Sequence, residues 1–113
     1  MLIRSFERGR CLVARLDHGM DIIGQITDLA KEKEIEIGFL SAIGALSRAE
    51  LGYYDLPFVH AHAVLSDREG RVWGGHLNSG MVFAAELYMQ ELLGLPLKRV
   101  PDSITGLNLW SEE

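Results

Sequence analysis

The feature of this sequence that most constrains its fold is a predicted β-hairpin over residues 58–77. Phe58–Leu65 is an apolar run typical of a strand, and Arg71–Leu77 predicts the returning strand. Between them, Asp67–Gly70 has the pattern of a type I turn, with Asp at its first position and Gly at its fourth. The two strands are therefore expected to lie side by side, so their residues can be matched in pairs.

Three histidines fall on this hairpin. His60 and His62 are two residues apart on one strand, so both side chains point to the same face. With a three-residue loop and a left-handed Gly70, His62 lies opposite His76. A five-residue loop would instead place His60 opposite His76. Either odd-length loop gathers all three imidazoles on one face, whereas an even-length loop turns His76 to the other face.

Histidines at this spacing can share one metal ion. Directly opposite Cβ atoms on paired strands lie about 4.5–5.5 Å apart, and imidazole nitrogens bind zinc at about 2.0–2.1 Å. Three neutral nitrogens without a thiolate suit Zn²⁺, with Ni²⁺, Cu²⁺ or Fe²⁺ as alternatives. Three protein ligands leave a fourth position open, as in catalytic zinc sites. The competing interpretation is that these are ordinary, hydrogen-bonded sheet histidines.

Outside the hairpin, the pattern predicts one helix and several strands. The helix has an apolar stripe formed by Ile22, Ile23, Ile26, Leu29 and Ala30. The expected strands are Arg10–Leu16, Ile35–Leu46 with a bend at Gly44, Arg48–Asp55 and Leu107–Trp110. Met81–Leu93 is ambiguous, because its residue types slightly favour a helix while its apolar residues alternate as in a strand.

Composition narrows the class of protein. A chain of 113 residues is expected to form a single domain. Its net charge of -5 gives no basic surface for gripping phosphates, so strong direct DNA binding is not expected. Hydrophobic residues make up 48% of this small chain, which favours a homo-oligomer. The sequence shows neither a signal peptide nor a membrane span, so we expect a cytoplasmic protein without membrane partners.

Glu86 is a further candidate for the site. It stands in an apolar stretch, where it could hold a histidine ligand by a hydrogen bond or act as a general base. The alternatives are an ion pair with Arg99 or a simply exposed charge. His18 is interpreted as a solvated loop residue.

Nearly the whole chain resembles the plants-and-prokaryotes-conserved (PPC) domain family. The residues that carry the resemblance are Gly19–Ile23, Gly38–Leu46, His60–Ala63, Asp67–Arg71, Gly74–Leu77, Glu86, Arg99 and Thr105–Leu107. The block of two histidines followed by Gly74-Gly75-His76-Leu77 is the most specific part.

The resemblance implies an α+β fold, in which a mostly antiparallel β-sheet has one main helix packed on it. It implies a homotrimer, a strand at Met81–Leu92, and a metal site at His60, His62 and His76. It also implies an assembly or regulatory role, and single-domain prokaryotic members are often labelled as DNA-binding candidates without a settled activity. A small zinc-dependent hydrolase is the alternative function.

One departure from the family is visible. Family members usually have two more strands near the position of Asp55–Pro57, and this sequence passes straight over them. The single domain over residues 1–113 therefore either lacks that hairpin or has a stretch of chain that the sequence omits. We expect the second case, with residues skipped between Asp55 and Leu56.

Overall fold

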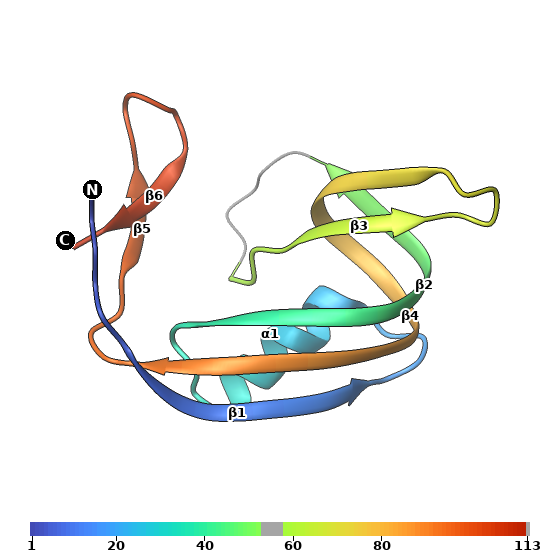
Figure 1. The fold of residues 1–113 in the computed structure, drawn as a ribbon, viewed down its shortest axis with the longest axis horizontal. Coiled ribbons are helices and arrows are strands. Elements are labelled where there is room, and N and C mark those ends of the chain that lie inside the picture. The colour runs from blue at the N-terminus through green and yellow to red at the C-terminus, as the bar shows by residue number, and fades with distance from the viewer. Residues whose placement is uncertain (53–57, 113) are drawn as a thin grey trace.

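The computed structural model describes residues 1–52 and 58–112 (Figure 1). The expectation about Asp55 and Leu56 therefore lies outside the described residues. The elements in chain order are β1 (Glu7–Leu16), α1 (Ile22–Glu32), β2 (Gly38–Gly52), β3 (His62–Ser66), β4 (Val72–Leu93), β5 (Lys98–Pro101) and β6 (Asn108–Ser111). In the part of the chain described, no helix has the length and apolar character needed to cross a bilayer.

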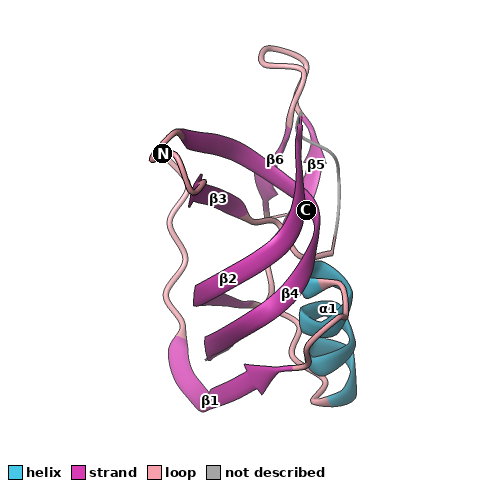
Figure 2. Cartoon of the chain, turned by 90° about the vertical axis from the view of Figure 1, so that its right-hand side faces the viewer, coloured by secondary structure: helices cyan, strands magenta, loops and turns pink. Residues whose placement is uncertain are grey.

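The long strand β4 organises the molecule. It pairs with β1, β2 and β3, always antiparallel, and β5 and β6 form a separate antiparallel pair. Figure 2 shows α1 against one face of the sheet formed by β1, β4 and β2. The expected α+β architecture, a mostly antiparallel sheet with one helix, is confirmed.

β4 corrects one expectation and resolves one ambiguity. Arg71–Leu77 and Met81–Leu93 are not separate elements, because one strand runs through Asn78, Ser79 and Gly80. The helix-forming residues after Met81 are in this strand, as the resemblance implied. The alternation of apolar residues outweighs their helix propensity here, because Ala85, Leu87 and Met89 all face the core of the protein. A helix would keep Ala85 and Met89 on one face but turn Leu87 to the opposite one.

β2 is likewise one strand where two were expected. It continues past Leu46 by shifting its register against β4 between Ala45 and Arg48. Gly44 lies directly before this irregularity with φ of 155°, and a Cβ there would lie 2.1 Å from the carbonyl oxygen of Ala84. Only glycine allows the backbones of β2 and β4 to approach so closely.

α1 is held at both ends. Asp21 caps its first turn, with its Oδ2 accepting a hydrogen bond of 2.7 Å from the Gly24 amide. The helix buries Ile22, Ile26 and Ala30 against the sheet. Ile26 is among the most completely buried side chains, together with Leu87 and Val82. This cluster is the core of the protein.

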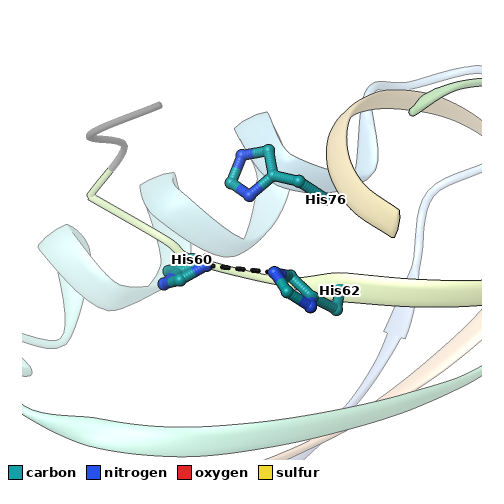
Figure 3. Close-up of side chains that lie close together, drawn as sticks. All are labelled: His60, His62 and His76. Carbon is teal, nitrogen blue, oxygen red and sulfur yellow. Dashed lines mark hydrogen bonds between the residues drawn. The ribbon is translucent and has the colours of Figure 1, made fainter. Parts of the chain in front are cut away.

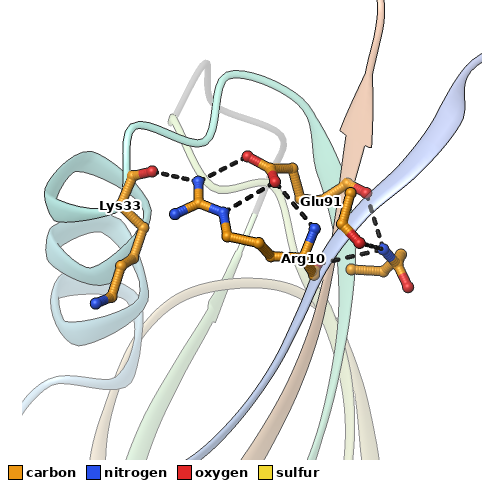
Figure 4. A network of polar contacts seen from close by, with 5 residues as sticks. Arg10, Lys33 and Glu91 are labelled. Carbon is orange, nitrogen blue, oxygen red and sulfur yellow. Dashed lines mark hydrogen bonds and ion pairs between the residues drawn. The ribbon is translucent and has the colours of Figure 1, made fainter.

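An ion pair fastens the far end of α1 to the sheet (Figure 4). The Arg10 guanidinium donates to both carboxylate oxygens of Glu91, at 3.0 and 2.7 Å, and also to the carbonyl oxygen of Lys33. These hydrogen bonds from Arg10 lower the pKa of Glu91 to about 2. β1, β4 and the C-terminal cap of α1 therefore meet at one charged contact.

The C-terminal region is more regular than its sequence indicated. The predicted final strand exists as β6, and it pairs with β5, which was not predicted. β5 is short and contains Pro101, so the sequence lacks the alternation that would have shown it.

Candidate metal centre

The turn between β3 and β4 sets the geometry of the site. The amide of Asp67 donates to the carbonyl of Arg71 at 3.0 Å, and that of Gly70 donates to the carbonyl of Asp67 at 3.1 Å. Gly70 is left-handed, with φ of 80°. The Asp67 carboxylate accepts from the amides of Glu69 and Arg71 and from the Arg71 guanidinium. The loop is therefore the expected three-residue loop, and the five-residue alternative is excluded.

This loop places His62 opposite His76 on the paired strands, as predicted. The strand expected over Phe58–Leu65 starts later in the structure, because β3 begins at His62 and His60 therefore precedes it. The chain nevertheless stays beside β4 before β3 begins, since the amide of Leu77 donates to the carbonyl of Ala61 at 2.9 Å. His60 therefore remains on the same side as His62.

The three imidazoles turn toward a common space (Figure 3). The Nε2 atoms of His60 and His62 lie 3.3 Å apart, and one nitrogen from each of the three rings lies within 4.8 Å of the others. The ring centroids are 5.2, 5.2 and 5.9 Å apart. His76 is buried, with 4% of its surface exposed, whereas His60 and His62 are exposed. The group is thus anchored on its β4 side and open on its β3 side.

This geometry fits a tetrahedral divalent cation. Two nitrogens bound at about 2.0–2.1 Å to a tetrahedral zinc ion lie about 3.3 Å apart. The Nε2 atoms of His60 and His62 are already at 3.3 Å. Without an ion, that approach requires one ring to donate an N–H to the other. The ligand nitrogen of His76 lies within 4.8 Å of the other two.

The electrostatic setting favours the neutral ligands that a metal needs. Partial burial lowers the pKa of His60, and the positive charges of Arg99, His76 and His62 lower it further. A neutral imidazole has a lone pair for a cation, whereas an imidazolium does not. His60 is therefore ready to act as a ligand at neutral pH.

A cleft of about 890 Å³ adjoins the group. His60 and His62 line it, together with residues of α1 and β2 and with Arg99 and Trp110 of the β5–β6 pair. The open side of the histidine group therefore faces a hollow large enough for a small molecule. From the sequence, Arg99 is a possible partner of Glu86 and one of the residues that carry the family resemblance. No pattern in the sequence placed Arg99 beside the histidines, because β5 itself was not predicted.

The structure does not bring Glu86 to this group. It is exposed on β4 between the buried Ala85 and Leu87, opposite Arg15 and Ile43 on the neighbouring strands. That position is on the sheet face turned away from α1. Of the two alternatives for Glu86, an ion pair with Arg99 or an exposed charge, the exposed charge describes it.

His18 also lies apart from the three histidines. It is in the turn before α1, and its Nδ1 is 2.8 Å from the carbonyl oxygen of Phe83. It is exposed, as expected of a loop residue.

Comparison with known proteins agrees with the fold. The sequence model of the Plants and Prokaryotes Conserved domain, abbreviated PCC or PPC, matches residues 3–57 and 52–93. The chain belongs to the PPC family. The two matched segments overlap at residues 52–57.

Two solved structures cover this PPC chain almost completely. A PPC protein from Pyrococcus horikoshii is 32% identical, with a TM-score of 0.88 and coverage of 100% of this chain and 99% of that one. A protein from Archaeoglobus fulgidus, named as metal-containing, is 35% identical, with a TM-score of 0.91 and coverage of 99% and 100%.

More distant relatives share the fold. A structure from Ralstonia eutropha named "Putative DNA-binding protein" is 21% identical, with a TM-score of 0.75 and coverage of 89% and 90%. Among curated proteins, the bifunctional protein GlmU of Synechococcus sp. (strain JA-3-3Ab) is 31% identical over 116 residues. That match covers 81% of the PPC chain but only 19% of the length of GlmU.

Proposed function

We propose that this PPC-family chain is a metal-binding assembly protein, in which His60, His62 and His76 hold a divalent cation and three copies form a homotrimer. The observation that carries the proposal is the convergence of the three ring nitrogens within 4.8 Å. The metal-containing name of the 35% identical relative from Archaeoglobus fulgidus supports it.

Zinc is the proposed cation. Three neutral imidazole nitrogens without a thiolate suit it, and the spacing of 3.3 Å between two of them matches tetrahedral bonds. Elemental analysis of purified protein tests this proposal. We expect about one zinc per chain, removable by a chelator and restored by added zinc. Protein that holds no divalent metal after incubation with zinc would contradict the proposal.

The proposed homotrimer rests on the sheet face opposite α1. Large apolar side chains are exposed there, including Val13 and Ile43, each 78% exposed, as well as Phe39 and Tyr88. Such a surface on a small protein favours contact with further copies. Light scattering at micromolar concentration should give three times the chain mass. The mass of a single chain would contradict the proposed homotrimer.

The proposed role is in assembly and regulation within the cytoplasm, without strong direct DNA binding. The chain has 16 acidic and 11 basic residues, and three of its arginines, Arg4, Arg10 and Arg71, lie in ion pairs with acidic side chains. We expect duplex DNA to bind no tighter than micromolar at physiological salt. A nanomolar complex would overturn this part of the proposal.

A zinc-dependent hydrolase is the second candidate, favoured by the cleft beside the histidines. Zinc with an open coordination position would supply an activated water there. Glu86 cannot serve as the base, because it lies on the other side of the sheet. Screens of ester and amide substrates with and without a chelator test this candidate. Hydrolysis that a chelator abolishes would support the hydrolase candidate. A zinc-loaded protein without hydrolase activity would contradict it, and the assembly role would then remain.

A further inference from the structure

Arg99 is the cation of the cleft beside the three histidines. It projects from β5, lines the cleft together with His60 and His62, and is close enough for its charge to lower the pKa of His60. Its guanidinium carbon lies 4.9 Å from the centre of the Trp110 ring. Its Nη1 donates to the carbonyl oxygen of Asn108 at 3.3 Å. Both contacts hold the guanidinium in place.

Among the described residues, none supplies a countercharge to Arg99. Across residues 1–52 and 58–112, no carboxylate lies within ion-pair distance of it, whereas Arg4, Arg10 and Arg71 all have such partners. Glu36 is the one acidic side chain among the described lining residues, and it lies in the link between α1 and β2. A fixed guanidinium with free N–H groups in a cleft is a site for an anion.

Most of the remaining cleft wall is apolar. It includes Ile22 and Ile26 of α1, Leu40 of β2, and Phe58 beside the histidines. A ligand that fills this space must therefore bury an apolar body as well as present a negative group.

We propose that this cleft binds a small carboxylic acid with an apolar body, whose carboxylate is held by Arg99 on the side of the three-histidine group. The inference rests on the proposed metal site, because three neutral histidines leave the charge of the ion uncompensated. One carboxylate placed between that ion and Arg99 would be attracted by both positive charges. The apolar body then lies along α1 and β2.

The site fits a carboxylate better than a phosphate. A guanidinium pairs with the two oxygens of a carboxylate through parallel N–H groups. A phosphate carries more charge and more oxygen acceptors, and it is usually surrounded by several donors or by a helix N-terminus. Arg99 is the only lysine or arginine among the described residues that line this cleft.

Binding of hexanoate to the cobalt-loaded protein tests the proposal, with acetate and hexan-1-ol as matched probes. The visible absorption of Co²⁺ reports a change around the metal, and calorimetry gives the affinity. We expect hexanoate to change the spectrum and to bind at least about tenfold tighter than acetate, because more apolar surface is buried. Hexan-1-ol, which lacks the carboxylate, should bind more weakly than hexanoate. Equal binding of the alcohol and the acid would overturn the proposal.

Two neighbouring substitutions isolate the role of the guanidinium. Arg99→Gln should weaken hexanoate at least about tenfold, the usual scale for a lost charge-assisted contact. Lys98→Gln removes the same charge from the same short strand, but Lys98 does not line the cleft. That variant should bind hexanoate within about twofold of the wild type. If both variants bind like the wild type, Arg99 is not the anion site and the proposal is wrong.

The cobalt content of each sample separates the two proposals. Protein that loads cobalt but shows no response to hexanoate contradicts the carboxylate site and leaves the metal site intact. Protein that does not load cobalt contradicts the metal site, and the carboxylate inference then fails with it. Normal cobalt loading of Arg99→Gln with weakened hexanoate binding supports both.

Discussion

Asp21 is expected to stabilise the protein through two contacts at once. One carboxylate oxygen caps α1 by accepting from the Gly24 amide at 2.7 Å. The other accepts from the amide of Gly80 in β4 at 2.9 Å. Gly80 is a buried residue, so its amide loses its acceptor in a poorly solvated place if the carboxylate is removed. A single side chain thus joins the start of the helix to the central strand.

The size of the effect follows from these two hydrogen bonds. Loss of an N-cap costs about 1 kcal/mol of unfolding free energy. Leaving a buried amide unpaired costs about 1 kcal/mol or more. Asp21→Ala should therefore lower the unfolding free energy by about 2 kcal/mol, which lowers the melting temperature of a domain this size by roughly 8 °C. Asp21→Asn keeps one acceptor oxygen and should lose about half as much.

Thermal and urea unfolding at one fixed protein concentration measure these differences, since assembly makes the melting temperature concentration-dependent. Asp28→Ala is the matched control, because Asp28 is an exposed residue in the middle of the same helix. That control should change the unfolding free energy by less than about 0.5 kcal/mol. If Asp21→Ala is no more destabilising than Asp28→Ala, the double role of Asp21 is refuted.

Three further predictions follow from other contacts. Because Arg10 lowers the pKa of Glu91 to about 2, the pair stabilises the fold above about pH 4.5 and loses this effect as the pH falls toward 2. The difference in unfolding free energy between wild type and Arg10→Leu should shrink over that range, and a constant difference would be contrary evidence. Gly44→Ala should prevent folding or greatly lower the melting temperature. Gly70→Ala should lower the unfolding free energy by only about 1–2 kcal/mol, because a Cβ there meets nothing within 4 Å. Equal effects of the two substitutions would refute the close approach at Gly44. Zinc affinity should fall as the pH drops through about 6.5, the ordinary pKa of histidine. The lowered pKa of His60 should move this fall in affinity toward lower pH. A zinc affinity that does not change with pH in calorimetric titrations would count against histidine ligands.

The sequence predicted the arrangement of the three histidines better than it predicted the strands. The turn residues Asp67 and Gly70 act locally, since one supplies the side-chain acceptor and the other the left-handed backbone. Together they set the loop length, and loop length fixes which histidines face one another. The pairing of His62 with His76 could therefore be predicted before any tertiary contact was known.

Strand continuity depends on longer-range contacts. Nothing local indicates that β4 runs through Asn78, Ser79 and Gly80, because these residues usually end a strand. They stay in the sheet because β2 pairs with them through its register shifts. The place of Arg99 in the cleft depends on the β5–β6 pair in the same way. Those relationships between distant segments are not visible as local patterns.

Metal content is the measurement that tests the central claim most directly. Wild type, His62→Ala and His18→Ala are purified alike, dialysed against the same low zinc concentration and analysed for bound zinc. His18→Ala is the matched control, since His18 is also an exposed histidine but lies outside the three-histidine group. We expect about one zinc per chain for wild type and the control, and less than about a tenth of that for His62→Ala, since a lost ligand weakens binding by about 100-fold or more. The three proteins should melt alike without metal, because His62 is exposed and the apolar core holds the fold. Equal zinc in His62→Ala and wild type would contradict the three-histidine site.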